Sequence, residues 1–264
     1  MSRIGLVLSG GGVNGLAHIG ALKVLDKLGV KFSAIAGCSM GSIIGACYAA
    51  GRTPQEIEDF ILKYKLVQLL DLSIYAISKL GITKTNKLKK ALDDFMGVNK
   101  FEELKIPMYI NATDLSKGKE VVFCSGELFK AIRASIAIPG VFAPPIIHKD
   151  YYVDGGVLDN VPFSILPSQI KKYIIIDAVP YEPLKTSKKP SLVKLLETSG
   201  RAAMDEIIRL RLKDIPDKNY VLVKPRIPEY KFIIHREKSL EIIRSGELAT
   251  QRKIPEIKHK FKVK

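Results

Sequence analysis

The sequence has too few cysteines to indicate disulfides or a zinc site. The 264 residues include three, Cys38, Cys47 and Cys124, and no two of them stand in a Cys-x-x-Cys spacing. An odd number without such a spacing is typical of reduced thiols, and their apolar neighbours predict that all three lie in the core. The first residues also lack an apolar run long enough for a signal peptide. We therefore expect a cytoplasmic protein that binds no metal.

Histidine is also scarce, which restricts the choice of a general base. The chain contains four histidines, of which His148, His235 and His259 follow the serine motif described below. Each of these three stands among charged residues, a setting typical of a solvated surface. His18 lies inside an expected helix, where we interpret it as a packed side chain. No histidine has an evident catalytic setting, although the three that follow the motif remain alternatives.

Acidic residues are too few to balance the basic ones. Lys and Arg number 42 against 27 Asp and Glu, giving a formal net charge of +15. Most of the excess lies between Lys185 and Lys264, with 21 basic and 10 acidic residues. Such a surface attracts anionic lipid or nucleic acid, but no nucleic-acid reader motif accompanies it. We therefore expect no nucleic-acid partner. We expect instead that the basic C-terminal third contacts the inner face of an anionic membrane peripherally.

Apolar runs alternate with helical periods over the first part of the chain. After the run Ile4–Leu8, apolar residues recur at the spacing of a helix, and this helix is expected to end at Gly29. A second run, Phe32–Ala36, precedes a helix of small residues over Met40–Ala50. This β-α-β-α order predicts an α/β fold with a parallel sheet that is covered on both faces.

The remaining elements fit one domain, residues 1–264. A capping box begins a helix at Thr53, and residues 64–105 form a helical excursion that we expect to cover the active site. We divide the domain into a motif-bearing core of about residues 4–180 and a basic C-terminal extension of about residues 185–264. Further strands are expected at residues 107–112, 121–123, 151–153, 172–177 and 220–223, helices at 127–134 and 192–212, and a surface loop at 180–190.

A glycine-rich loop follows the first expected strand. Residues Gly10 to Gly15 match G-x-G-x-x-G between a strand and a helix, the context of a dinucleotide-binding turn. That use requires an acidic residue at the end of the second strand, but the strand ends in apolar residues and glycine, and Asp26 lies inside the helix. A glycine loop at a helix N-terminus also presents main-chain N–H groups to developing negative charge. An oxyanion hole and a plain tight turn are therefore the other interpretations.

The next strand leads into a second motif. Residues Gly37 to Gly41 match G-x-S-x-G, which places Ser39 on a sharp strand-to-helix turn with its hydroxyl exposed. The flanking Gly37 and Gly41 leave room for the bend. A serine that merely caps a helix is the alternative, but the glycine loop on the preceding strand favours a nucleophile.

A carboxylate is the better candidate to accept the proton of that serine. Asp154 leaves an apolar run and is followed by Gly155 and Gly156, which let the chain turn sharply. A carboxyl with an ordinary pKa near ~3.9 is a poor base for an alcohol, so this use requires a dry site and a hydrogen bond to Ser39. An ordinary Asp-Gly turn is the alternative.

Together these stretches resemble the patatin-like phospholipase family. The glycine-rich loop, the serine elbow and the Asp-Gly-Gly motif occur in the family's order. Arg133 to Phe142 resembles a fourth block, and Asp159 to Pro162 continues the aspartate motif. The likeness covers about residues 4 to 180, and four ordered blocks are far more specific than any one of them.

The resemblance implies a three-layer α/β/α sandwich and a lipid acyl hydrolase of phospholipase A or esterase type. In it, Ser39 attacks an ester carbonyl and Asp154 accepts its proton without a histidine. Gly10, Gly11 and Gly12 form the oxyanion hole, and the amides of Gly11 and Gly12 are its hydrogen-bond donors. Gly15 supports the conformation of the loop. Water releases the acyl enzyme, and no cofactor is needed.

One departure from the family pattern and two rival functions stand beside this interpretation. Asn14 occupies a position where many members carry Arg or Lys, which affects the geometry of the loop or the substrate preference. The rivals are a dinucleotide-binding oxidoreductase that uses the loop from Gly10 to Gly15, and a catalytically silent lipid-binding module.

Overall fold

A computed structural model describes residues 3–63, 81–179, 190–227 and 235–263 of the chain. Residues 64–80 of the predicted helical excursion over 64–105, and most of the predicted surface loop, residues 180–189, lie outside the described residues. The strands are β1 (Ile4–Leu8), β2 (Ala34–Gly37), β3 (Met108–Asp114), β4 (Lys119–Phe123), β5 (Ile146–Ile147), β6 (Asp150–Asp154), β7 (Lys172–Ile176) and β8 (Tyr220–Val223). The α-helices are α1 (Ala17–Lys27), α2 (Met40–Ala49), α3 (Pro54–Lys63), α5 (Gly81–Met96), α6 (Leu128–Ser135), α7 (Leu192–Leu212) and α8 (Arg236–Phe261), and a 3-10 turn, η1 (Gly12–Leu16), precedes α1.

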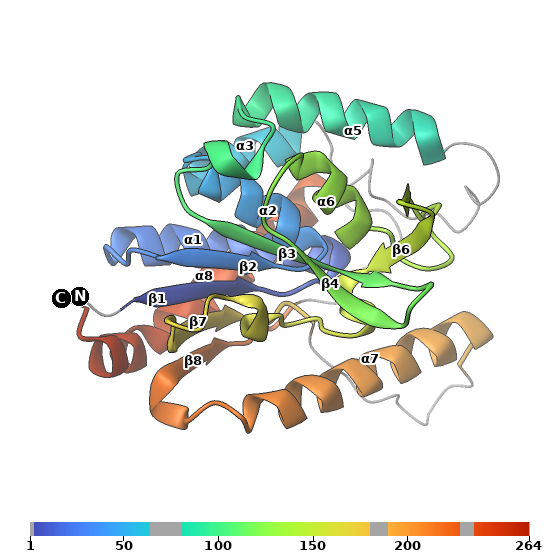
Figure 1. Cartoon of the computed structure of the whole chain (residues 1–264). Helices are drawn as coiled ribbons and strands as arrows, with labels where there is room; N and C mark the ends of the chain where they lie inside the picture. Colours follow the sequence, from blue (N-terminus) through green and yellow to red (C-terminus); the bar gives the residue numbers. More distant parts are fainter. Residues whose placement is uncertain (1–2, 64–80, 180–189, 228–234, 264) are drawn as a thin grey trace.

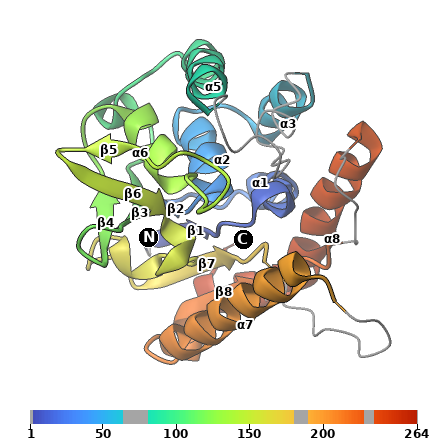
Figure 2. The same cartoon turned by 90° about the vertical axis from the view of Figure 1, so that its right-hand side faces the viewer.

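The strands form one mainly parallel sheet in the order β5-β6-β3-β2-β1-β7-β8, with β4 attached to β3. The five neighbours from β3 to β8 run parallel, while β4, β5 and β6 are antiparallel to their partners. Helices lie on both faces, as Figures 1 and 2 show. The predicted α/β/α sandwich with a mainly parallel central sheet is confirmed.

The two faces of the sheet follow from the alternation of side chains along its strands. In β1, Leu6 and Leu8 belong to the larger core, which contains buried residues of α1, α2, α3, α5, α6 and α8. Val7 points to the opposite face, where it packs with Ile208 and Leu212 of α7. Because β1 is buried on both faces, it appears in the sequence as a continuous apolar run.

The C-terminal extension contains a helix that the sequence analysis missed. Helix α8 packs along α1, and the two backbones come into contact at a pair of glycines. A Cβ placed on Gly20 of α1 would lie 1.9 Å from the carbonyl oxygen of Ile243, and one on Gly246 of α8 would lie 1.9 Å from that of Ala17. Ile242, Ile243, Ile257 and Phe261 of α8 also belong to the larger core.

The predicted burial of the cysteines is partly wrong. Cys38 and Cys47 are free thiols in the core, but Cys124 is exposed. It follows β4, which among the described strands pairs only with β3. The other edge of β4 is therefore not covered by a described strand, and its residues are exposed or partly buried. Within the described ranges, no helix has both the length and the apolar composition required to cross a membrane.

Candidate active site

Ser39 occupies a strained turn between β2 and α2. It has φ 49° and ψ −121°, and a positive φ is uncommon for a residue with a side chain and costs on the order of 1–3 kcal/mol. The turn also needs its flanking glycines. A Cβ on Gly37 would lie 2.7 Å from the carbonyl oxygen of Gly41, and one on Gly41 would lie 2.3 Å from that of Leu8. Strain of this kind persists only where the surroundings hold it, and it is typical of functional sites.

Two serine hydroxyls hold the main chain of Ser39 in place. The Ser39 N–H donates to Ser135 Oγ at 2.8 Å. Ser42 Oγ donates to the Ser39 carbonyl oxygen at 2.6 Å. The sequence analysis included Ser135 in a family-like segment but gave it no task, since only the packing of α6 against the turn reveals the contact.

The register of the sheet explains how Asp154 reaches Ser39 across more than a hundred residues of sequence. Strand β4 occupies one edge of β3 from Ile110 to Asp114, so β2 and β6 must share the other edge. On that edge, Gly37 at the end of β2 lies opposite Ile110, and Asp154 at the end of β6 lies opposite Ala112. The two strands run toward each other and stop two positions apart. The residues that follow β2 therefore meet Asp154.

The Asp154 carboxylate is buried and hydrogen-bonded from several sides. It accepts the main-chain N–H of Gly156 at 2.8 Å and lies 3.7 Å from the thiol sulfur of Cys38. Burial raises the pKa of Asp154 to about 6, and hydrogen bonds from the Ser39 side chain, the Gly156 amide and the Cys38 thiol oppose the rise. A carboxylate with this pKa is a stronger base than an exposed one, yet it is ionised at neutral pH.

The loop that carries Asp154 is itself fixed by polar contacts. A Cβ on Gly155 would lie 2.5 Å from Asn111 Oδ1, and Asn111 Nδ2 donates to the Asp159 carbonyl oxygen at 2.7 Å. The Asp159 carboxylate forms an ion pair with Arg211 of α7 at 2.6 Å. Burial raises the pKa of Asp159 to about 7, and the Arg211 guanidinium opposes the rise.

The glycine-rich loop passes the turn at Ser39 with glycine-type backbone angles. Gly11 has φ 146° and Gly12 has φ 54°. The Gly10 N–H donates to the Asn160 carbonyl oxygen at 3.2 Å, which joins the loop to the segment after Asp154. The first bond of η1 runs from the Asn14 N–H to the Gly11 carbonyl oxygen, so the earlier amides of Gly11 and Gly12 have no acceptor within the turn. They are the candidate oxyanion donors.

Gly15 and Asn14 complete this loop. A Cβ on Gly15 would lie 2.4 Å from Met40 Cγ, so the loop can approach α2 closely only with glycine there. Asn14 is buried and makes a polar contact within the protein. The acidic residue considered for a dinucleotide, Asp26, accepts a hydrogen bond from the Tyr48 hydroxyl at the far end of α1.

The histidines have other places in the structure. His18 is fully buried and its Nε2 lies 2.9 Å from the Ser9 carbonyl oxygen. Burial lowers its pKa to about 4, so it is neutral and packed, as predicted. The other three side chains are exposed: His148 at the turn between β5 and β6, His235 before α8 and His259 in its last turn.

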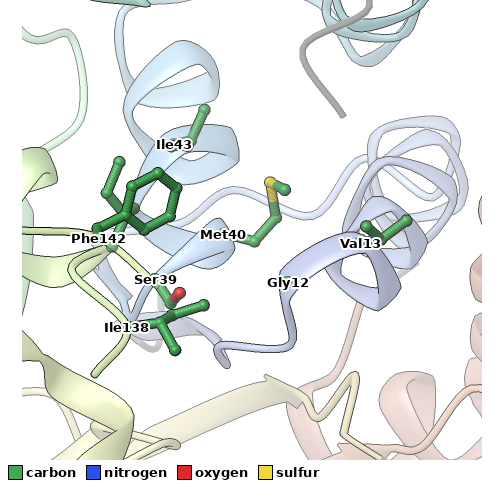
Figure 3. A pocket seen from close by; sticks show the side chains of 8 residues that line it. Gly12, Val13, Ser39, Met40, Ile43, Ile138 and Phe142 are labelled. Atoms are coloured by element: carbon green, nitrogen blue, oxygen red, sulfur yellow. The ribbon is translucent and has the colours of Figure 1, made fainter. Parts of the chain in front are cut away.

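The Ser39 side chain opens into an apolar pocket. Figure 3 shows it between Ile138 and Phe142 on one side and the turn at Gly12 on the other. The lining residues are Gly12, Val13, Ser39, Met40, Ile43, Ile136, Ile138 and Phe142. Among the residues that the structure describes, no group of three or more His, Cys, Asp or Glu side chains is placed to hold a metal ion.

Comparison with known proteins gives consistent matches for this part of the chain. A sequence profile for patatin-like phospholipases matches residues 6–167. An uncharacterized NTE family protein of Mycobacterium tuberculosis (strain H37Rv) is 41% identical over 168 residues, 61% of this chain and 45% of its own length. The patatin-like phospholipase domain-containing protein 6 of Mus musculus is 33% identical over 184 residues, 66% of this chain and 13% of its own. The chain thus spans less than half the length of these curated relatives.

Solved structures show the same fold at low sequence identity. VipD from Legionella pneumophila superposes with a TM-score of 0.55 and 14% identity, over 96% of this chain and 66% of its own. A structure of full-length ExoU in complex with full-length SpcU, from Pseudomonas aeruginosa, gives a TM-score of 0.52 and 15% identity, over 98% of this chain and 52% of the matched chain. At these identities the likeness concerns the fold.

Proposed function

The chain belongs to the patatin-like phospholipase family, and from this premise we propose that it is a lipid acyl hydrolase that uses Ser39 and Asp154 as a catalytic dyad. The substrates are carboxylic esters of phospholipids or related acyl lipids, as in a phospholipase A or an esterase. A relative in Cryptococcus neoformans, 31% identical over 184 residues, is named a lysophospholipase, and the apolar lining of the pocket suits an acyl chain.

The proposed reaction begins with the Ser39 hydroxyl. Its oxygen attacks the ester carbonyl while its proton passes to the Asp154 carboxylate, and the amides of Gly11 and Gly12 stabilise the negative charge on the former carbonyl oxygen. Collapse of this intermediate expels the alcohol, which takes the proton from Asp154, and leaves an acyl ester on Ser39. Water, deprotonated by Asp154, then releases the fatty acid and restores the serine.

The observation that carries the proposal is the meeting of β2 and β6 on one edge of β3. It brings a strained serine and a buried carboxylate of raised pKa together beside the glycine loop. A structural capping serine would need neither the strain nor the carboxylate. The buried site also supplies the dry surroundings that a carboxylate needs to act on an alcohol.

The test combines an activity-based probe with an ester assay. The wild-type chain should be labelled by a fluorophosphonate and should hydrolyse a p-nitrophenyl acyl ester, whereas Ser39→Ala should do neither and should keep its melting temperature. Asp154→Asn should retain the fold and lose most of its turnover, by about 10²-fold or more. A matched control is Ser245→Ala, because the Ser245 hydroxyl donates to the Ile242 carbonyl oxygen of its own helix.

The rival functions predict other results. A silent lipid-binding module would bind lipid vesicles equally well with and without the change Ser39→Ala, and it would not react with the probe. A dinucleotide-binding protein would show a higher melting temperature with NAD(P). Labelling that persists in Ser39→Ala would rule out the proposed nucleophile.

A further inference from the structure

Helix α7 contributes a charged side chain to the loop that carries Asp154. Arg211 Nη1 lies 2.6 Å from Asp159 Oδ2, and Arg211 Nη2 donates to Ser164 Oγ at 2.9 Å. Figure 1 shows α7 on the side of the sheet opposite α2, the helix that follows Ser39. The ion pair therefore connects the active-site loop to a helix of the C-terminal third, which holds none of the sequence motifs of the site.

Apolar packing sets the position of Arg211 on α7. Ile208 and Leu212, three residues before it and one after it, are buried in the core on that side of the sheet, together with Phe163. Phe163 precedes Ser164 in the chain, so the same packing brings the hydroxyl acceptor to the helix. The Arg211 side chain is 31% exposed. Because its helix is already held, this side chain loses little further freedom when it pairs with a carboxylate.

The Asp159 carboxylate needs a countercharge. Its side chain is 1% exposed, and while Oδ1 accepts the Val161 N–H at 3.1 Å, Oδ2 accepts no hydrogen bond from a described residue. Burial and, to a lesser extent, the negative charge of Glu120 raise the pKa of Asp159, and the Arg211 guanidinium opposes the rise. A buried charge that loses its partner is strongly destabilising. Arg211 is therefore the group that allows this carboxyl to ionise within the fold.

The main chain of Asp159 holds the turn that follows Asp154. We call this turn, Gly155 to Asn160, the aspartate turn. The Asp159 N–H donates to the Gly155 carbonyl oxygen at 2.9 Å, and its own carbonyl oxygen accepts a bond from Asn111 Nδ2 at 2.7 Å. A displacement of Asp159 would therefore shift Gly155, which is covalently bonded to Asp154.

Both ends of the aspartate turn touch the reaction centre. Near its start, the Gly156 N–H donates to the Asp154 carboxylate at 2.8 Å. At its end, the Asn160 carbonyl oxygen accepts the Gly10 N–H at 3.2 Å. A Cβ on Gly10 would lie 2.4 Å from Asn160 Oδ1 and 3.2 Å from Ser39 Cβ, so the three residues are in close contact. A group that fixes the turn therefore fixes both the base and the glycine loop relative to the serine.

We propose that Arg211 is a positioning residue for the proposed dyad. Its charge holds the ionised Asp159 carboxylate in the fold, and the aspartate turn thereby keeps the Asp154 carboxylate and the glycine loop in place. The inference deepens the proposed function and rests on it, because the positioned group is the proposed base. It gives the C-terminal third a task at the active site.

The ion pair gives the proposal a signature in pH. The titratable and charged groups that face the Asp159 carboxyl are Arg211, Glu120 and the Cys38 thiol, and the thiol is neutral because burial and the nearby carboxylates raise its pKa. In Arg211→Gln the opposing charge is absent, so the pKa of Asp159 should exceed about 7. Below that pKa the protonated carboxyl needs no counterion. Above it, the variant must bury an unpaired charge or release the turn.

The pH profile of the full chain on a p-nitrophenyl acyl ester tests the proposal, with product followed at the isosbestic wavelength of p-nitrophenol. The parent should keep its plateau to pH ~9. Arg211→Gln should match the parent within about twofold at pH ~6 and lose kcat about tenfold or more at pH ~9, with KM little changed. Adding Asp159→Asn to Arg211→Gln should restore the plateau, because no buried charge then remains. Arg211→Lys, which retains a positive charge, should also keep the plateau.

The matched control is Arg209→Gln on the same helix. Arg209 pairs with Glu206, and the two side chains are 55% and 52% exposed, so this variant should follow the parent at every pH. Urea unfolding is a second measurement, which does not depend on hydrolysis. The stability of Arg211→Gln relative to the parent should fall as pH rises above about 7, and the added change Asp159→Asn should remove this dependence. Circular dichroism at pH ~6 should show that all variants are folded.

Three results would overturn the proposal: the same pH profile for Arg211→Gln and the parent, a uniform loss of kcat at every pH that Asp159→Asn does not relieve, or an equal alkaline loss in Arg209→Gln. The second result would leave Arg211 with a packing role alone. The proposed function fails separately, through a parent chain that neither reacts with the fluorophosphonate nor hydrolyses the ester.

Discussion

The main-chain N–H of Ser39 donates to the hydroxyl of Ser135 across 2.8 Å, and this bond ties the turn after β2 to the last residue of α6. Both serines are buried. The two therefore have different tasks: the side chain of Ser39 faces the pocket, while that of Ser135 satisfies a main-chain donor that the strained turn would leave without a partner. An unsatisfied buried N–H costs about 1–3 kcal/mol.

Ser135→Ala should therefore destabilise the fold and disturb the turn. We expect the free energy of unfolding to fall by about 1–3 kcal/mol and kcat on a soluble ester to fall with it. Urea denaturation and steady-state kinetics measure the two effects. Ser42→Ala is the matched control, because the Ser39 carbonyl also accepts the Ser42 N–H at 2.8 Å and keeps that bond. Equal losses in both variants would contradict a special role for Ser135.

Hydrolysis should depend on the ionisation of Asp154. Burial raises the pKa of this carboxyl to about 6, and only the ionised form accepts the serine proton. The rate constant kcat/KM on a soluble ester should thus rise with pH through about 6 and level off above it. The other carboxyl of raised pKa in this loop is Asp159, so Asp159→Asn should keep the inflection. A profile that is flat from pH 5 to pH 7, roughly one unit on either side of the inflection, would exclude Asp154 as the base.

The same carboxyl should limit stability at neutral pH. Because its folded-state pKa is raised above the ordinary 3.8 to about 6, the folded chain holds this proton more tightly than the unfolded chain does. The protonated Asp154 carboxyl therefore contributes to the free energy of unfolding. This contribution is complete below pH ~3.8 and is lost as pH rises through about 6. Asp154→Asn should therefore be the more stable protein above pH ~6, by up to about 3 kcal/mol, with the advantage shrinking toward pH ~4. Thermal unfolding of the two proteins across this range measures the difference, and an advantage that grows at low pH would contradict the sign.

The contact of α1 with α8 should tolerate no side chain at Gly20. Gly20→Ala would place a methyl group 1.9 Å from the Ile243 carbonyl oxygen, and the helices would have to separate at a cost of about 1–3 kcal/mol or more. Gly200→Ala is the matched control in α7, because a Cβ there meets no heavy atom within 4 Å. That change should stabilise the chain by about 0.5–1 kcal/mol, since alanine favours a helix over glycine. Chemical denaturation distinguishes the two.

The strands and turns that carry the site could be predicted because apolar runs and turn glycines in the sequence indicated the same elements. The apolar run of β1, the Ser39 turn with its glycines and the Asp154 turn each match the structure in place and type. The spacing of Leu88, Leu92, Phe95 and Met96 also predicts one face of a helix, and in α5 three of them are buried while Phe95 is partly buried. What the sequence could not supply was the register along β3, because residues 35–37 and 152–154 pair with the same strand from different parts of the chain.

Helix α8 escaped prediction for a physical reason. Small or polar residues interrupt the apolar period of its buried side, which consists of Ser239, Ile242, Ile243, Gly246, Thr250, Ile257 and Phe261. Pro255 lies within the helix and has the appearance of a helix breaker in sequence. A face that packs through close backbone approach leaves little hydrophobic signal, whereas a face that packs through leucine and isoleucine is visible in the pattern.

The position of β1 bears on how the chain can be divided. The strand that leads into the glycine loop is held on one side by β2 and on the other by β7, which begins after the last residue that the family profile matches. A fragment cut at residue 167 would lack β7, β8 and α8, turn β1 into a bare edge open to aggregation, and uncover the glycine contact of α1. We therefore expect that the glycine loop and the turns at Ser39 and Asp154 can be exchanged between relatives only together with the C-terminal third, and that swaps of residues 6–167 alone should yield insoluble chimeras.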